Sequence, residues 1–188
     1  MRKSLLFLVA LAAFGSSLQA ADQFDKRGAV TPRKAPEFVF KMPEGEKLLS
    51  SYRGKTIVLA MMFTTCQHCQ NTAHLLTKFQ SEYASKGVQV LGAVFDKDAK
   101  TGLANFKRIT GATFPIGISE QGAVLEFLGL QPTDPYFVPI LVFIDKNGIL
   151  RSQYVNDDKF LDEAKQEANI RMEIDKTLAG QKAGAAKK

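Results

Sequence analysis

The sequence has no tryptophan, only two histidines and only two cysteines among its 188 residues. Because it contains fourteen phenylalanines, we expect the aromatic part of its core to be mainly phenylalanine. The composition is otherwise that of a globular protein, with 45% hydrophobic and 23% charged residues. The bulk of the chain therefore fits none of the collagen-like, coiled-coil or disordered classes, and its length suggests one domain with tails.

A strong charge of one sign is also missing. The formal net charge is +6, and the positive residues are spread along the chain. The only concentrated basic segment is the tail 179–188, where Lys182, Lys187 and Lys188 stand among alanine and glycine. Such a composition predicts a disordered, solvated end. No basic stripe carries interleaved aromatic residues, so the sequence indicates no binding to nucleic acid.

No apolar run reaches the ~20 residues that a membrane-spanning helix needs. At the N-terminus, Arg2 and Lys3 precede an apolar run from Leu5 to Phe14, and small residues follow as far as Ala20. This pattern predicts a signal peptide over residues 1–20, cleaved near Ala20, and a periplasmic or otherwise extracytoplasmic protein without a stable membrane span. An uncleaved anchor or a buried helix is the alternative.

Hydrophobic periodicity divides the remaining chain into a polar leader or linker, residues 21–35, and one folded domain, residues 36–178. The expected strands are 38–40, 56–63, 88–95, 140–144 and 149–155; a turn or short helix is expected at 46–53, and helices at 66–85, 99–110, 121–128 and 158–178. The residues expected to face the core are Cys69, Ala73, Leu76, Phe79 and Tyr83 on the first helix, and Leu103, Phe106 and Ile109 on the second.

The order of these elements predicts an α/β fold. Apolar strands that alternate with helices pair in parallel through right-handed crossovers, and the last two strands form a hairpin that adds an antiparallel edge. The sequence therefore predicts a mixed central sheet with helices on both faces.

The two cysteines form the motif Cys66-Gln67-His68-Cys69, which follows an apolar strand and opens a helix after Thr64 and Thr65, both suitable N-cap residues. A disulfide between them closes too short a loop to stabilise the fold appreciably, so the pair is interpreted as chemically reactive rather than structural. The helix N-terminus favours a thiolate at the first cysteine. We therefore expect a redox-active disulfide in which Cys66 attacks and Cys69 resolves.

The two histidines have different interpretations. His68 lies between the cysteines, where a hydrogen bond or a positive charge from its ring would favour the thiolate, although it could equally be an exposed helix residue with no role. His74 is interpreted as a surface residue. Zinc binding by both cysteines and both histidines is the alternative for the whole motif, but these residues share one short helical segment, and zinc sites usually draw ligands from two elements.

From about residue 36 to the last helix, the sequence resembles the TlpA-like extracytoplasmic thioredoxins of the redoxin superfamily. The matching segments are Ala35-Pro36-Glu37-Phe38, Tyr52-Arg53-Gly54-Lys55, Phe63-x-x-Cys66-x-x-Cys69, Val138-Pro139 and Asp145-Lys146-Asn147-Gly148. The resemblance implies a thioredoxin fold with an N-terminal extension, and a thiol–disulfide oxidoreductase that needs no cofactor or metal. Its partners would be cysteine-containing exported proteins and an unidentified redox partner; neither the substrate protein nor the direction of electron flow is specified.

The resemblance also implies a substrate groove. Pro139 would have a cis peptide bond and lie beside the cysteines, exposing the backbone of Val138 to a substrate strand, with Tyr136 and Phe137 as flanking apolar contacts. The alternative is a trans proline at the start of an edge strand.

Several positions depart from the family pattern. Thr65 replaces the usual tryptophan, Ala60 replaces a buried carboxylate, and Thr72 replaces a glutamate found in some relatives. Asp96, at the end of a neighbouring strand, is the candidate to substitute for the missing carboxylate. A thiol peroxidase is one alternative, although Phe63 stands where peroxiredoxins have threonine. A binding or metal-handling protein of the same fold is the other.

Overall fold

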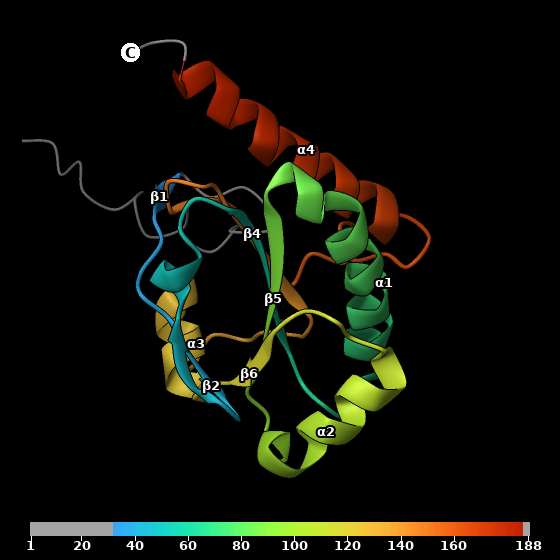
Figure 1. Cartoon of the computed structure of the whole chain (residues 1–188). Helices are drawn as coiled ribbons and strands as arrows, with labels where there is room; N and C mark the ends of the chain where they lie inside the picture. Colours follow the sequence, from blue (N-terminus) through green and yellow to red (C-terminus); the bar gives the residue numbers. More distant parts are fainter. Residues whose placement is uncertain (1–31, 186–188) are drawn as a thin grey trace, which may run out of the picture.

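The computed structural model describes residues 32–185, which are built around one eight-stranded sheet (Figure 1). Its strands are β1 (Arg33–Lys34), β2 (Val39–Met42), β3 (Gly45–Leu48), β4 (Thr56–Met62), β5 (Val88–Val94), β6 (Ile116–Ile118), β7 (Ile140–Ile144) and β8 (Ile149–Tyr154). Their order across the sheet is β1-β8-β7-β4-β5-β6-β2-β3. The predicted signal peptide lies outside the described residues.

Helices cover both faces of this sheet. The α-helices are α1 (Gln67–Tyr83), α2 (Ala99–Thr110), α3 (Gln121–Leu128) and α4 (Gln166–Ala185), and the two short 3-10 helices are η1 (Leu49–Tyr52) and η2 (Ala84–Lys86). Figure 1 shows α1, α2 and α4 on one side of the sheet and α3 on the other. The predicted fold class, a mixed sheet between helices, is therefore confirmed.

Strand β4 is the centre of the sheet because it pairs in parallel with β5 and antiparallel with β7. All seven of its residues are buried. Alternate side chains point to opposite faces, so Val58 packs in the cluster beneath α1 and α4, whereas Leu59 packs in the cluster beneath α3. Full burial of such a side chain contributes about 1.5–3 kcal/mol, which explains why the strand is a continuous apolar run.

The structure corrects several boundaries. The sheet begins at β1, within the segment predicted as a linker. The last helix begins at Gln166 rather than 158, because residues 157–165 form turns in which Asp157 accepts hydrogen bonds from Phe160 and Leu161. Helix α4 also continues to Ala185, through most of the segment predicted as a disordered tail. Residues 186–188 lie outside the described residues.

Within the predicted elements one core assignment was wrong. All five residues predicted to face inward on α1 are buried, as are Leu103 and Phe106 on α2. Ile109, however, is 44% exposed, and the next residue, Thr110, is buried in its place, where its hydroxyl donates to the carbonyl of Phe106. The helix is therefore rotated slightly from the orientation that hydrophobicity alone predicts.

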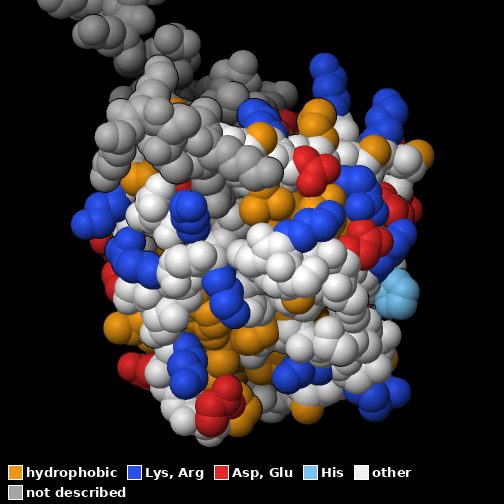
Figure 2. All heavy atoms as spheres, turned by 45° about the horizontal axis from the view of Figure 1, so that its top comes forward, with side chains coloured by type: hydrophobic (Ala, Val, Ile, Leu, Met, Phe, Trp, Pro, Cys, Tyr) orange, Lys and Arg blue, Asp and Glu red, His pale blue; other side chains and the backbone are white. Residues whose placement is uncertain are grey.

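The surface shows no concentration of one charge on the face drawn in Figure 2, where Lys and Arg side chains are scattered with Asp and Glu side chains among them. None of the helices between residues 32 and 185 is long and apolar enough to cross a membrane.

Candidate active site

The active-site motif lies where β4 passes into α1. The strand ends at Met62, and Cys66 is the N-cap of the helix, in place of the predicted Thr64 or Thr65. The Cys66 side chain is half-buried, and its sulfur accepts a hydrogen bond from the backbone N–H of Cys69 at 3.2 Å. A cysteine as N-cap places its sulfur among the unpaired N–H groups of the first turn, which favour negative charge.

The two thiols have different environments. Both cysteines are free, but Cys69 is completely buried, whereas Cys66 is partly exposed. Burial raises the pKa of the Cys69 thiol, and hydrogen bonding between its side chain and that of Cys66 raises it further. A raised pKa keeps Cys69 protonated, and burial denies it contact with an external disulfide. The geometry therefore leaves Cys66 as the sulfur that a partner can reach first.

The loop that precedes β7 lies against Cys66. The peptide bond between Val138 and Pro139 is cis, and the Cys66 thiol donates to the Val138 carbonyl oxygen, with 3.7 Å between the sulfur and the oxygen. Phe137, immediately before, is 70% exposed, whereas the other phenylalanines between residues 32 and 185 are buried or partly buried. The structure thus brings together the cysteine motif and the three residues predicted to form a groove, although they are about 70 residues apart in the sequence.

Asn156, which was not among the predicted site residues, holds this loop from outside it. Its side-chain amide donates to the Pro135 carbonyl at 2.8 Å, and its side-chain oxygen accepts from the Phe137 N–H at 2.6 Å. Asn156 has a φ of 55°, the left-handed conformation that asparagine adopts more readily than most residues. An asparagine directly after the predicted strand 149–155 was therefore the available signal for this contact.

The ring of His68 makes its hydrogen bond with Glu163. The ring is exposed, and Nδ1 lies 3.1 Å from Oε1 of Glu163, which also accepts from the side-chain amide of Asn71. These residues line a cavity of about 280 Å³ that also contacts Phe137 and Pro139. His68 is thus next to the predicted groove, but its partner Glu163 was not anticipated.

The loop before Cys66 is held by Asp96. One carboxylate oxygen accepts from the backbone N–H of Thr64 at 2.8 Å, and the other accepts from the Thr64 hydroxyl at 2.7 Å. The rings of Phe63 and Phe95 pack edge to face with centroids 4.7 Å apart. Asp96, proposed from the sequence as a substitute carboxylate near Cys69, therefore has both oxygens engaged by Thr64.

His74, the other histidine, contacts the end of α2. Its side chain is exposed, and Nδ1 lies 3.3 Å from the Thr110 carbonyl oxygen. Among residues 32–185, no three His, Cys, Asp or Glu side chains are grouped so that they could hold a metal ion.

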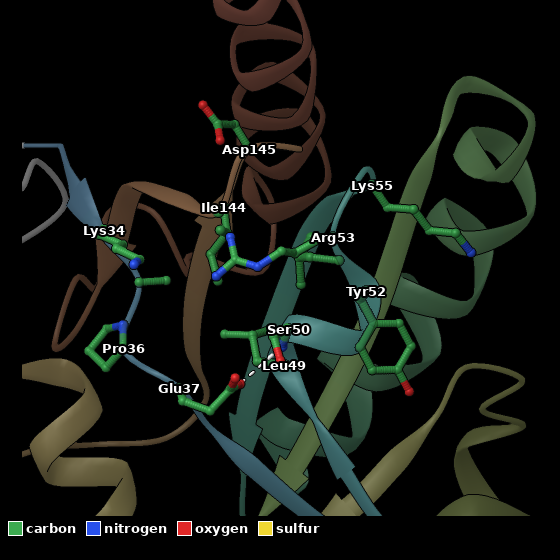
Figure 3. A pocket seen from close by; sticks show the side chains of 13 residues that line it. Lys34, Pro36, Glu37, Leu49, Ser50, Tyr52, Arg53, Lys55, Ile144 and Asp145 are labelled. Atoms are coloured by element: carbon green, nitrogen blue, oxygen red, sulfur yellow. Dashed lines mark hydrogen bonds between the residues drawn. The ribbon is translucent and has the colours of Figure 1, made fainter.

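A separate cavity of about 400 Å³ lies at the other end of the sheet (Figure 3). The guanidinium of Arg53 points into it. The Glu37 carboxylate turns toward Ser50 and accepts a hydrogen bond from the Ser50 backbone N–H at 3.0 Å. Its lining includes Ile57, near the start of β4, whereas Cys66 follows the end of that strand. Since seven strand residues span about 20 Å, this cavity is not part of the cysteine site.

Comparison with known proteins agrees with this geometry. The family model described as Redoxin matches residues 32–170. Thiol-disulfide oxidoreductase ResA of Geobacillus thermodenitrificans is 33% identical over 147 residues, which cover 78% of this chain and 81% of the relative. Thioredoxin-like protein YneN of Bacillus subtilis is 26% identical over 125 residues, covering 65% of this chain and 70% of YneN.

A solved structure supports the same fold. The crystal structure of a thiol:disulfide interchange protein, thioredoxin family protein, from Chlorobium tepidum TLS superimposes with a TM-score of 0.61 at 19% identity. The match covers 76% of this chain and 97% of that protein. The arrangement of strands and helices around the cysteine motif is therefore that of a thioredoxin-like fold.

Proposed function

We propose which residues carry out the exchange reaction of this protein. The chain belongs to the Redoxin family and is a thiol–disulfide oxidoreductase. In this proposal Cys66 is the attacking thiol and Cys69 the resolving thiol. The observation that carries it is the asymmetry of the pair: Cys66 is partly exposed as the N-cap of α1, whereas Cys69 is buried one turn later.

The disulfide exchange proceeds in two steps. The Cys66 thiolate attacks one sulfur of a partner's disulfide; a mixed disulfide forms, and the partner's other sulfur leaves as a thiolate that takes up a proton. Cys69 then loses its proton and attacks Cys66, which releases the partner's remaining sulfur as the second thiol. Two electrons pass from the dithiol to the partner, and the protein ends with a Cys66–Cys69 disulfide. The reverse sequence oxidises a partner dithiol.

The partners are proteins that carry thiols or disulfides. We assign the groove to Phe137, Val138 and Pro139, because the Val138 carbonyl touches the attacking sulfur and the exposed Phe137 ring offers an apolar contact beside it. An extended partner segment would pair with the backbone at Val138 and place its cysteine next to Cys66, as in other cases of strand addition.

The site of action is proposed to be outside the cytoplasm, in the bacterial periplasm or an equivalent compartment. The support is the sequence of residues 1–20, with its basic start, short apolar run and small residues. Disulfides form and persist in such compartments, so a dithiol protein there meets the substrates that its chemistry requires.

Reduction of insulin disulfides by the purified protein tests the function. With a dithiol reductant as electron source, the protein should accelerate insulin precipitation, and the variant that lacks both Cys66 and Cys69 should match the uncatalysed rate. Peroxide consumption without insulin reduction would instead favour a thiol peroxidase. Activity in neither assay would leave a binding protein of the same fold.

His68 is proposed to modulate the reduction potential. A protonated ring near the motif would stabilise a Cys66 thiolate and thus the reduced form, so His68→Ala should make the potential more negative by more than about ten millivolts. Equilibration with glutathione redox buffers measures this. His74→Ala, which alters an exposed histidine on the same helix, is the matched control and should leave the potential unchanged. An equal reduction potential in the wild type and both variants would show that His68 does not modulate the potential and serves only its contact with Glu163.

A further inference from the structure

A large cleft lies beside the active-site loop and has no role in the exchange steps. Its volume is about 1120 Å³, and it is formed by α2, the ends of β5 and β6, and the turn after β2, elements that meet at one end of the sheet in Figure 1. Its lining includes the lysines Lys97, Lys100 and Lys107 and the apolar residues Leu103 and Ile116.

This cleft is connected directly to the loop that carries Cys66. Asp96, one of its lining residues, accepts both hydrogen bonds from Thr64, two residues before Cys66. Helix α2 packs closely on the same threonine: a Cβ added at Gly102 would come within 2.6 Å of the Thr64 hydroxyl oxygen. A segment bound in the cleft would therefore lie next to the active-site loop.

The walls of the cleft carry unbalanced positive charge. Four of its lining residues are lysines and two are carboxylates. Glu120 forms an ion pair with Lys41 at 2.7 Å, and Asp96 keeps its negative charge while its two oxygens accept from Thr64, so the formal net charge of the lining, four minus two, is +2. The other three lysines are Lys97, Lys100 and Lys107. They are exposed, and none has an ion-pair partner among residues 32–185.

The floor of the cleft is apolar. Leu103 and Ile116 are 8% and 2% exposed, and Met42 and Ile118 are partly buried beside them. The cleft thus combines an apolar floor with a positively charged wall, whereas the cavity beside His68 is lined by the carboxylates of Asp158 and Glu163.

We propose that this cleft docks an acidic, partly apolar segment of the protein that exchanges its disulfide with Cys66; the proposal rests on the oxidoreductase function above. The volume exceeds the ~300–1,000 Å³ typical of small-molecule pockets. Lys100 and Lys107 are seven helical residues apart, about 10 Å along α2, which three residues of extended chain would span. A polypeptide with carboxylates along its length therefore reaches both lysines while its apolar side chains cover the floor.

The expected consequence is selection of partners by charge. Complementary charges beside a reactive group raise the rate of productive encounters, and salt reduces this effect over about 10 Å at 0.1 M ionic strength. A partner whose cysteine is flanked by acidic residues should therefore react faster than one flanked by basic residues, mainly at low salt.

Two disulfide-containing peptides test the docking. They are identical except that one carries glutamates and the other carries lysines at the same positions on either side of the disulfide. The reduced full-length protein is mixed with each, and the second-order rate constant is measured at 20 mM and 300 mM sodium chloride. The acidic peptide should react at least about tenfold faster at the lower salt, and the ratio should fall toward one at the higher salt.

Charge reversal locates the effect. The double variant Lys100→Glu/Lys107→Glu should lose the preference for the acidic peptide, whereas Lys34→Glu/Lys146→Glu, the same charge change at exposed lysines at the other end of the sheet, should keep it. The rate with neutral hydroxyethyl disulfide should be unchanged in both, which shows that the cysteine chemistry is intact. Equal thermal denaturation midpoints confirm that both are folded.

The outcomes separate the two proposals. Equal rates with both peptides in the wild type, or equal loss of preference in both double variants, would overturn the docking proposal while leaving the oxidoreductase function in place. Failure to reduce either peptide, insulin or hydroxyethyl disulfide would overturn the residue roles assigned to the cysteines, and the docking proposal with them.

Discussion

Replacing Cys69 with serine should trap the protein in mixed disulfides with its partners, whereas replacing Cys66 with serine should abolish exchange. In Cys69→Ser the exposed attacking thiol remains, but nothing can resolve the bond that it forms. In Cys66→Ser the remaining thiol is 0% exposed, and burial raises its pKa, so at neutral pH it is protonated and inaccessible. Turnover by Cys66→Ser should therefore fall at least about 10³-fold, as expected when a nucleophile is lost.

Non-reducing electrophoresis and intact-mass spectrometry measure the trapping. Cys69→Ser incubated with a disulfide peptide should gain the mass of the peptide, and dithiothreitol should remove it. The variant lacking both cysteines is the control and should gain nothing. Equal amounts of adduct on Cys66→Ser and Cys69→Ser would contradict the assigned roles, because it would show that the thiol of Cys69 is as reachable as that of Cys66.

The elements that could be predicted from the sequence are those with strong local patterns. Helices α2 and α3 were predicted with the bounds that the structure shows, because amphipathic spacing marks their length and Gly111 and Gly129 follow them in the left-handed conformation. The buried run of β4 was equally clear. In these segments the residues that determine the structure are neighbours in the sequence.

The elements that were missed are short strands without a strong local pattern. Strand β1 exists because Arg33 and Lys34 pair with β8, and β6 is three residues long and pairs with β5 and β2. Strand β3 is exposed along its whole length, so it shows no alternation of apolar and polar residues. Strands β1 and β6 acquire their hydrogen bonds from segments far away in the sequence, whereas β3 pairs with β2 in a local hairpin, and none of the three has a pattern that distinguishes it from a loop.

In the candidate site, too, the features with a local sequence pattern were predicted and most contacts between distant residues were not. The place of Cys66 at a strand-to-helix junction was readable from local pattern, but the closeness of Pro139 was inferred only through family resemblance. The contact of His68 with Glu163 joins residues 95 positions apart and had no local signal. The hydrogen bonds between Asp96 and Thr64 are similar. The sequence showed a carboxylate at the end of a strand, but it did not indicate that Thr64 would donate to it.

Asp145 illustrates a residue whose importance exceeds its apparent role in a turn. From the sequence it was placed only in the segment Asp145-Lys146-Asn147-Gly148, between the two strands of the predicted hairpin. In the structure it is 1% exposed; one carboxylate oxygen accepts from the N–H groups of Asn147 and Ile149, and the other accepts from the Arg151 guanidinium. Figure 3 shows its side chain pointing away from the cavity that lies beside it, which agrees with a structural role.

Replacing Asp145 with alanine should lower the free energy of unfolding by about 3 kcal/mol, because it removes charge-assisted hydrogen bonds and leaves two backbone N–H groups and part of a guanidinium without an acceptor. Asp145→Asn should lose less, since an amide oxygen can still accept from the two N–H groups, although its NH₂ then faces Arg151. Urea denaturation followed by circular dichroism measures both changes.

Lys146→Ala is the matched control, because Lys146 is exposed in the same turn, and its effect should stay within about 0.5 kcal/mol. The turn follows β7 at Ile144, which pairs with Ile57, whereas Ile140 at the other end pairs with Met61, beside the cysteine motif. The folded Asp145→Ala variant should therefore reduce insulin at close to the wild-type rate below its unfolding transition. A loss of exchange without a loss of stability would instead show that this turn takes part in the chemistry.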